Sequence, residues 1–114
     1  MGGFFYLFRI EHFMLYHEDR EAIEKSKGRL QLNYDNHERS YTYKFGIAKT
    51  LLNVSKRGDA HLRRFPAISK PEIILVFTIF VGDPYLAEGL WKSHFRSEWI
   101  SKIDFDYALQ ECDR

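Results

Sequence analysis

The chain has 114 residues, and its 17 basic and 16 acidic side chains leave a formal net charge of +1. This balance excludes a protein that binds nucleic acid through bulk positive charge, and it equally excludes an acidic tail. The length fits one domain, and 45% apolar with 29% charged residues is ordinary for a folded protein. Ten Phe, seven Tyr and two Trp exceed the obvious needs of one small core, which indicates a further interaction surface.

The cysteine content and the apolar runs predict a cytoplasmic protein. Cys112 is the one cysteine, so neither an internal disulfide nor a cysteine-based zinc cage is possible, as expected of a reducing compartment. The N-terminal segment lacks a basic region, and charged residues interrupt its apolar run, unlike a signal peptide. The longest apolar run, residues 73–81, is short of the ~20 residues needed to span a bilayer. We therefore expect no membrane association.

The first half of the chain predicts a strand, a helix and a hairpin. Residues 4–11 are rich in β-forming types, with Tyr6, Phe8 and Ile10 on one face. Residues 18–27 have acidic residues in the first turn and basic ones in the last, which predicts a short, largely exposed helix that stops at Gly28.

Two further alternating stretches flank a turn-like cluster. Residues 30–34 and 41–47 alternate apolar with polar side chains on either side of residues 35–38, which predicts a hairpin with one buried face. Residues 51–54 are predicted to extend this sheet. Residues 55–71 contain Gly58, Pro66 and Pro71 among scattered charges, and they are predicted to form a long loop.

The second half predicts a buried strand, a helix and a last strand. Residues 73–81 are almost wholly apolar, which is typical of a central strand or of one covered by a second subunit. Asp83 and Pro84 form a helix N-cap and first position, and apolar residues then recur at helical spacing to about residue 100. Alternation over residues 103–107 predicts a final strand.

These elements predict a single α+β domain spanning residues 1–114. Its mainly antiparallel sheet, flat or curved, has about five strands, with two helices packed on one face. The predicted core consists of Phe8, Ile10, Leu32, Tyr43, Phe45, Ile47, Leu75, Phe77, Ile79, Leu90, Trp91 and Phe95.

Three residues are catalytic candidates if the protein is an enzyme. His94 lies on the apolar face of the predicted helix, where a buried imidazole with a carboxylate partner could act as a general base. Asp104 and Asp106 would share one face of the last strand and could share a proton or hold Mg²⁺. The simpler interpretations are a hydrogen-bonded core histidine and a charged edge strand that resists aggregation.

Charge is unevenly distributed along the chain. Residues 39–70 hold eight basic side chains against one acidic, a local charge of +7. The binding candidates for nucleic acid or an acidic partner are Arg39, Lys44, Lys49, Arg57, Arg63 and Arg64. The aromatic residues of this segment alternate onto one face, which favours a core role for those rings.

Three functional hypotheses remain open, and the absence of a phosphate loop, a nucleophile elbow or metal-spaced histidines favours a non-enzymatic role. The first is a non-catalytic interaction module acting as a homodimer, since interfaces are rich in aromatic residues. The second is a small hydrolase- or lyase-like enzyme with an aromatic-lined pocket between sheet and helix. The third is nucleic-acid binding through residues 39–70. No cofactor or metal is expected.

Overall fold

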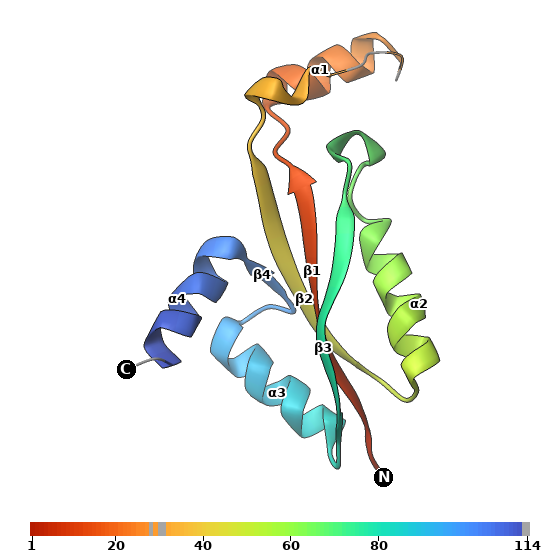
Figure 1. Ribbon diagram of the computed structural model, residues 1–114, viewed down its shortest axis with the longest axis vertical. Coiled ribbons are helices and arrows are strands. Elements are labelled where there is room, and N and C mark those ends of the chain that lie inside the picture. The colour runs from red at the N-terminus through yellow and green to blue at the C-terminus, as the bar shows by residue number, and fades with distance from the viewer. Residues whose placement is uncertain (28, 30–31, 113–114) are drawn as a thin grey trace.

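The structure, a computed structural model, describes residues 1–27, 29 and 32–112 (Figure 1). This part of the chain is an α+β domain with one antiparallel sheet of four strands in the order β3-β1-β2-β4. The strands are β1 (Gly3–Phe13), β2 (Arg39–Ala48), β3 (Glu72–Val81) and β4 (Trp99–Ser101). The helices are α1 (His17–Lys25), α2 (Leu51–Leu62), α3 (Pro84–Phe95) and α4 (Lys102–Cys112), with short 3-10 turns at Tyr34–Asn36 and Ala67–Ser69. The predicted fold class is confirmed, although four strands and four helices replace about five and two.

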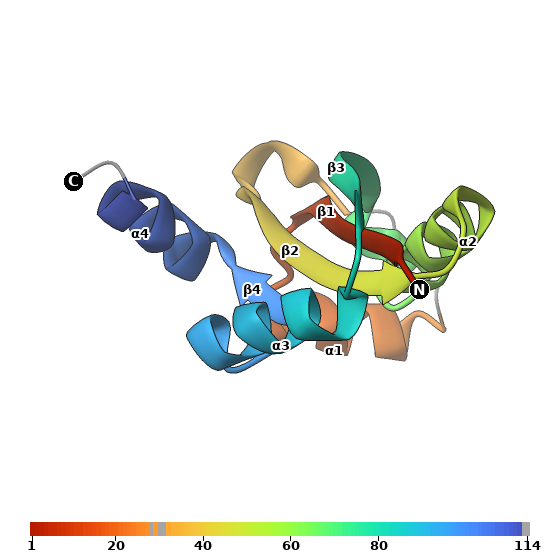
Figure 2. The same cartoon turned by 90° about the horizontal axis from the view of Figure 1, so that it is seen from below.

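β1 is the central strand of the sheet, and both of its faces are buried. Phe5 and Leu7 pack on one face against α3, and Tyr6 and Phe8 pack on the other against Val54 of α2. Helices therefore cover both faces of the sheet, as Figure 2 shows for α2 and α3, and the prediction that they pack on one face is wrong. Successive residues of a strand point to opposite faces, so a strand buried on both faces needs apolar residues at consecutive positions. This explains the run of aromatic residues at the start of β1.

The predicted strand at residues 4–11 is confirmed, but the predicted hairpin is wrong in its first arm. Around Tyr34 the chain forms a 3-10 turn, capped by the Asn33 side chain, which accepts a hydrogen bond from the amide of Asp35. β2, the predicted second arm, pairs with β1 instead. The predicted exposed helix is present as α1, and the predicted stop, Gly28, lies outside the described residues, as does Leu30.

The predicted strand extension at 51–54 is wrong, and the predicted loop at 55–71 is wrong over residues 55–62, because residues 51–62 form α2. Residues 63–71 contain no α-helix or strand, only turns and the 3-10 turn at Ala67–Ser69. The helix starts where the Thr50 hydroxyl accepts a hydrogen bond from the amide of Asn53 at 3.1 Å. Its buried residues are Val54, Gly58 and His61, spaced four and three apart, so they form one face. The helical spacing of these three residues was hard to recognise in the sequence, because the apolar Leu51 and Leu52 in the first turn are exposed and do not belong to the buried face.

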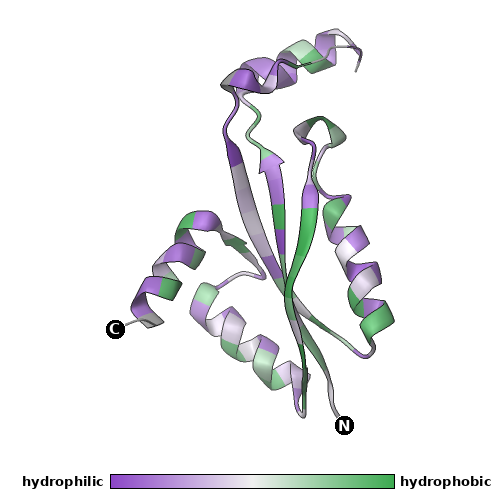
Figure 3. Cartoon of the chain, in the orientation of Figure 1, coloured by the Kyte–Doolittle hydropathy of each residue, from purple (hydrophilic) through white to green (hydrophobic). Residues whose placement is uncertain are grey.

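β3 is a strand as predicted, but it is not central. Among the described residues it pairs with β1 alone and forms one edge of the sheet. Its side chains are largely exposed in the single chain, and Figure 3 shows the strand coloured as hydrophobic over most of its length. The prediction of a central strand is therefore wrong. The alternative, cover by a second subunit, stays a prediction.

The predicted N-cap of the following helix is confirmed, because the Asp83 carboxylate accepts a hydrogen bond from the amide of Leu86 at 3.0 Å. α3 ends at Phe95, earlier than the predicted residue 100. The next residue, Arg96, adopts a left-handed conformation with φ of 62°, which ends the helix. The predicted last strand at 103–107 is wrong. It forms part of α4, where Phe105 stacks on Tyr43 with ring centroids 3.9 Å apart.

The core is displaced towards β1 relative to the prediction. Of the predicted core, Phe8, Ile10, Tyr43 and Phe45 are buried, and Leu32, Ile47, Trp91 and Phe95 are half-buried. Leu75, Phe77, Ile79 and Leu90 are exposed, which corrects the prediction for them, and Phe5, Tyr6, Leu7, Val54 and Ile100 are buried instead.

The radius of gyration is 16.6 Å, against about 13 Å for a compact domain of this length. None of the helices in the described residues combines the length and apolarity that crossing a bilayer requires.

Candidate active site

A polar pocket of about 270 Å³ lies beside β2, between α2 and α3. β4 pairs with β2 at Thr42–Lys44, and the amide of Phe45 donates to the carbonyl of Glu98, so within the described chain β2 has no strand partner on this side from Gly46 onwards. The pocket is lined by residues of the strands β1, β2 and β4, of the helices α2 and α3, and of the segments after α2 and before β4.

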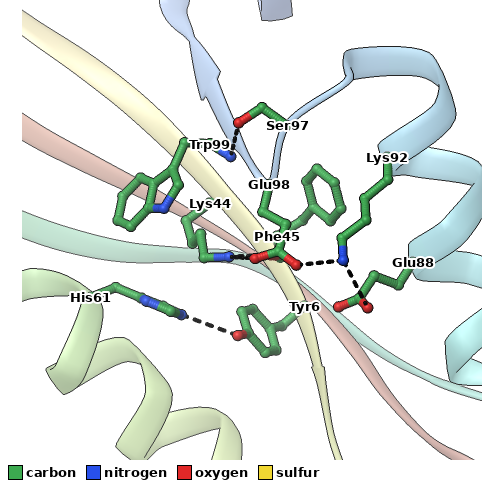
Figure 4. Close-up of polar contacts among 9 residues, drawn as sticks. All are labelled: Tyr6, Lys44, Phe45, His61, Glu88, Lys92, Ser97, Glu98 and Trp99. Carbon is green, nitrogen blue, oxygen red and sulfur yellow. Dashed lines mark hydrogen bonds and ion pairs between the residues drawn. The ribbon is translucent and has the colours of Figure 1, made fainter.

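Tyr6 and His61 form the buried centre of this pocket. The Tyr6 hydroxyl lies 3.1 Å from Nε2 of His61, although 55 residues separate them in the sequence. Tyr6 is 2% exposed and His61 is 9% exposed. Period-two alternation turns Tyr6 of β1 towards α2, whose buried face carries His61 (Figure 4).

The surroundings keep His61 neutral. Burial, together with the charges of Lys44, Arg64 and Arg57, lowers the pKa of His61 to about 4. Burial likewise raises the pKa of Tyr6 to about 12, against a smaller lowering by Arg57. At neutral pH the Tyr6 phenol is protonated and the His61 imidazole is neutral, and in the tautomer with its proton on Nδ1 the Tyr6 hydroxyl donates to Nε2.

Arg57 and Arg64 supply positive charge at the pocket wall. Arg57 lies four residues before His61 on α2, so the helical period brings these two to one side, and Arg64 follows the Arg63 C-cap and lines the same pocket. Within the described residues neither guanidinium has a carboxylate within salt-bridge distance, whereas other cations of the pocket are paired. Unpaired arginines in a concave site favour an anionic ligand.

Glu98 lines the pocket and forms ion pairs with two lysines, as Figure 4 shows. Its two carboxylate oxygens lie 2.7 Å from Nζ of Lys44 and 2.7 Å from Nζ of Lys92. These two hydrogen bonds lower the pKa of Glu98 to about 2. The Lys44 ammonium, which is buried, also donates to the carbonyl of Phe45 at 3.1 Å. Glu98 is therefore a structural anion that satisfies a buried cation.

Glu88 of α3 is the other carboxylate of the pocket. It is bound less tightly, with Oε1 3.5 Å from Nζ of Lys92. The described residues contain no group of three or more His, Cys, Asp or Glu placed to hold a metal ion. A Mg²⁺ ion often uses one or two carboxylates and completes its coordination with substrate phosphate and water. Glu88 is a single carboxylate of this kind, and it is already paired with Lys92.

Trp99 provides a half-buried aromatic surface at the rim. Its ring contacts His61 edge-on with centroids 5.6 Å apart, and the side chains of Lys44 and Arg64 lie 5.6 and 5.8 Å from its centroid. An aromatic ring beside cations is suited to stacking on a nucleobase.

The three catalytic candidates from the sequence lie outside this pocket. His94 is on the exposed side of α3, beside an apolar groove, with its ring against Phe95. Asp104 and Asp106 lie in the first half of α4, where residues two apart point in different directions, so the expected shared face does not exist. The structure does not bring the three together.

The six basic candidates are separated into four places. Lys44, Arg57 and Arg64 line the pocket. Lys49 lines a neighbouring groove of about 640 Å³, which also includes Arg57. Arg39 is distant, paired with Glu72 at 3.3 Å. Arg63 is exposed at the end of α2.

The sequence predictions did not include Tyr6, His61, Glu88, Glu98 or Trp99 in any site. The sequence did contain one signal, the four-residue spacing of Arg57 and His61. This spacing places the two side chains on one side only if the segment is a helix. Tyr6 was predicted only to share one face of the first strand with Phe8 and Ile10, and nothing local distinguishes it from the other rings of β1.

Comparisons with protein-family models, curated proteins and solved structures found no match to this chain.

Proposed function

We propose that the protein is a hydrolase that cleaves phosphodiester bonds of nucleic acid in the pocket around Tyr6 and His61. The observation that carries the proposal is the 3.1 Å contact between the Tyr6 hydroxyl and a neutral, buried imidazole. The contact lies in a pocket where Arg57 and Arg64 lack carboxylate partners among the described residues. A proton acceptor beside anion-binding cations is the combination that attack on a phosphate requires.

The chemistry is a water-driven displacement at phosphorus. Water attacks the phosphorus atom, and its proton passes to the Tyr6 oxygen as the Tyr6 proton passes to Nε2 of His61. The bond from phosphorus to the leaving oxygen breaks, and that oxygen takes a proton from solvent. The products are a phosphate monoester and an alcohol, and His61 then returns its proton to water.

The cations and Glu88 have separate roles in this step. Arg57 and Arg64 hold the phosphate oxygens and stabilise the charge that grows on them in the transition state. Glu88 would hold a divalent cation together with the phosphate, and such an ion neutralises charge and lowers the pKa of bound water.

Two features favour nucleic acid over a small phosphate ester. The pocket continues through Arg57 into the neighbouring groove with Lys49, so a longer anionic chain has cations beyond the central phosphate. At the other side Trp99, with Arg64 above it, can stack on a base.

The test is cleavage of labelled single-stranded DNA, double-stranded DNA and RNA by the purified chain, with Mg²⁺, Mn²⁺ or EDTA. Removing a positioned acid–base group costs about 10²–10⁴-fold in rate, so Tyr6→Phe and His61→Asn are each expected to lose that much. Removing one charge-stabilising donor costs about 10²–10³-fold, which is the loss expected for Arg57→Ala. Glu88→Gln is expected to abolish the response to added metal.

Matched controls change the same residue types outside the pocket. Arg63→Ala removes an arginine that is next to Arg64 but does not line the pocket, and Tyr107→Phe removes an exposed phenol of α4. Both are expected to retain the wild-type rate, whereas a contaminating nuclease would cleave equally in the Tyr6→Phe and His61→Asn preparations. Wild-type protein that cleaves none of the substrates under any metal condition would overturn the proposal.

The second candidate function is nucleic-acid binding without cleavage, favoured by the same cations. It predicts affinity that falls steeply with salt and an unaltered affinity in Tyr6→Phe. Binding that depends on Arg57 and Arg64 while no substrate is cut would select it.

A further inference from the structure

β3 has the properties of a strand that pairs with another chain. Its outer edge has no strand partner among the described residues, and its apolar side chains are exposed on both faces, with Phe80 62% exposed. Natural edge strands are usually protected by lysine, proline or covering segments. β3 contains neither residue, and its protection is one irregularity in its pairing with β1 between Leu7 and Phe8.

An apolar groove continues from this edge. It has a volume of about 710 Å³ and lies between β3, α3 and α4, lined in part by Val76, Phe77, Leu90 and Leu109. Figure 3 shows hydrophobic colour on β3 and on parts of both helices. Exposed apolar patches of this kind mark interaction sites.

The exposed apolar surface extends from β3 onto α3 and α4. The eight side chains concerned are Ile74, Leu75, Val76, Phe77, Ile79, Phe80, Leu90 and Leu109. They are on average about half exposed, so each keeps a large part of its surface for a contact with another chain. A standard interface buries ~800 Å² per partner, so the contact would include the groove as well as the strand edge.

The charges around β3 fit a second copy of the same chain. A two-fold contact brings equal residues close together, so charge near its axis would repel. No charged residue lies between Glu72 and Asp83, and Glu72 is already paired with Arg39 at 3.3 Å. Antiparallel overlap of two β3 strands places Lys70 of one copy near Asp83 of the other, where their charges attract.

We infer that the chain forms a two-fold dimer by antiparallel pairing of β3 with β3 of a second copy. Pairing joins the two sheets into one of eight strands and covers the apolar groove. The two polar pockets lie beside β2, on the side of β1 away from β3, so both stay open. The dimer does not depend on the proposed hydrolase activity.

The experiment is sedimentation velocity with the full chain from about 1 to about 100 µM, since association follows mass action. Wild-type protein is expected at twice 13.6 kDa. Ile79→Lys is expected at 13.6 kDa with an unchanged circular dichroism spectrum, because a lysine here is solvated in the monomer. Leu52→Lys, a matched change at a 65% exposed leucine of α2, is expected to remain dimeric.

Two further measurements keep the test independent of folding defects. Asp83→Asn retains a side-chain acceptor for the cap of α3 and is expected to weaken the dimer about two- to thirty-fold, as for loss of the two symmetry-related exposed ion pairs. Amide hydrogen exchange in β3 is expected to be slow in the dimer and faster in Ile79→Lys.

A wild-type monomer throughout the concentration range overturns the inference. So does a dimer that survives Ile79→Lys, or one whose β3 amides exchange as fast as those of the monomer, because either result places the contact elsewhere.

Discussion

Tyr6 lies directly opposite Gly46 in the antiparallel pairing of β1 with β2, and its ring extends across that glycine. A Cβ atom at position 46 would overlap with the Tyr6 hydroxyl and would lie 2.6 Å from Cζ of the ring. The missing side chain at residue 46 is therefore what allows Tyr6 to reach His61.

Gly46→Ala is expected to displace the Tyr6 ring and separate the hydroxyl from His61. A misplacement of about 1 Å costs on the order of 10²-fold in a positioned reaction, and the overpacking costs ~1–3 kcal/mol of stability. Cleavage rate and urea denaturation would measure both. Full activity with the alanine in place would contradict this account of the site.

Gly89→Ala is expected to have the opposite effect on stability. Gly89 is an exposed interior residue of α3, and a Cβ there meets no atom within 4 Å. Alanine is favoured over glycine in a helix by about 1 kcal/mol, so the free energy of unfolding should rise by that amount. Thermal and urea unfolding would measure the gain, and cleavage activity should not change. A loss of stability would show that this part of α3 is not a regular helix.

Stability is expected to fall as the pH is lowered from about 6.5 to about 4. The pKa of His61 is about 4 in the folded chain against 6.5 in its ordinary state, so in this window the unfolded chain binds a proton that the folded chain does not. The difference is at most about 3 kcal/mol at 1.36 kcal/mol per pKa unit.

Urea denaturation at a series of pH values would test this dependence. His61→Asn should lose most of it, and His17→Asn, which changes an exposed histidine, should retain it. Equal slopes in wild type and His61→Asn would show that other groups govern the acid response.

Glu98→Gln is expected to destabilise the chain. Lys44 is buried, and its ion pair with Glu98 at 2.7 Å offsets the cost of removing its charge from water. Its remaining hydrogen bond to the Phe45 carbonyl and the partial exposure of Glu98 reduce the loss to about 1–3 kcal/mol. Glu88→Gln breaks a more exposed pair and should cost less than about 1 kcal/mol. Equal unfolding free energies for the two variants would contradict a structural role for Glu98.

Local patterns in the sequence were sufficient for several elements. The N-cap formed by Asp83 and Pro84, the charge order of α1 and the β-forming residues of β1 depend on neighbours along the chain, and all three predictions were confirmed. Local patterns were ambiguous at residues 51–62 and 103–107. There the sequence pattern suggested a strand or a loop, but both segments form helices in the structure. Contacts with the sheet favour the helix, as the stacking of Phe105 of α4 on Tyr43 illustrates.

The sequence by itself determined an α+β domain, an apolar strand at residues 72–81 and a basic middle segment, because burial preference, caps and charge are properties of single residues and their near neighbours. Only the tertiary structure decided that β3 lies at the edge of the sheet and that Tyr6 meets His61 across 55 residues. Strand order and long-range contacts depend on which surfaces pack together, and a periodic pattern specifies a buried face without specifying what covers it.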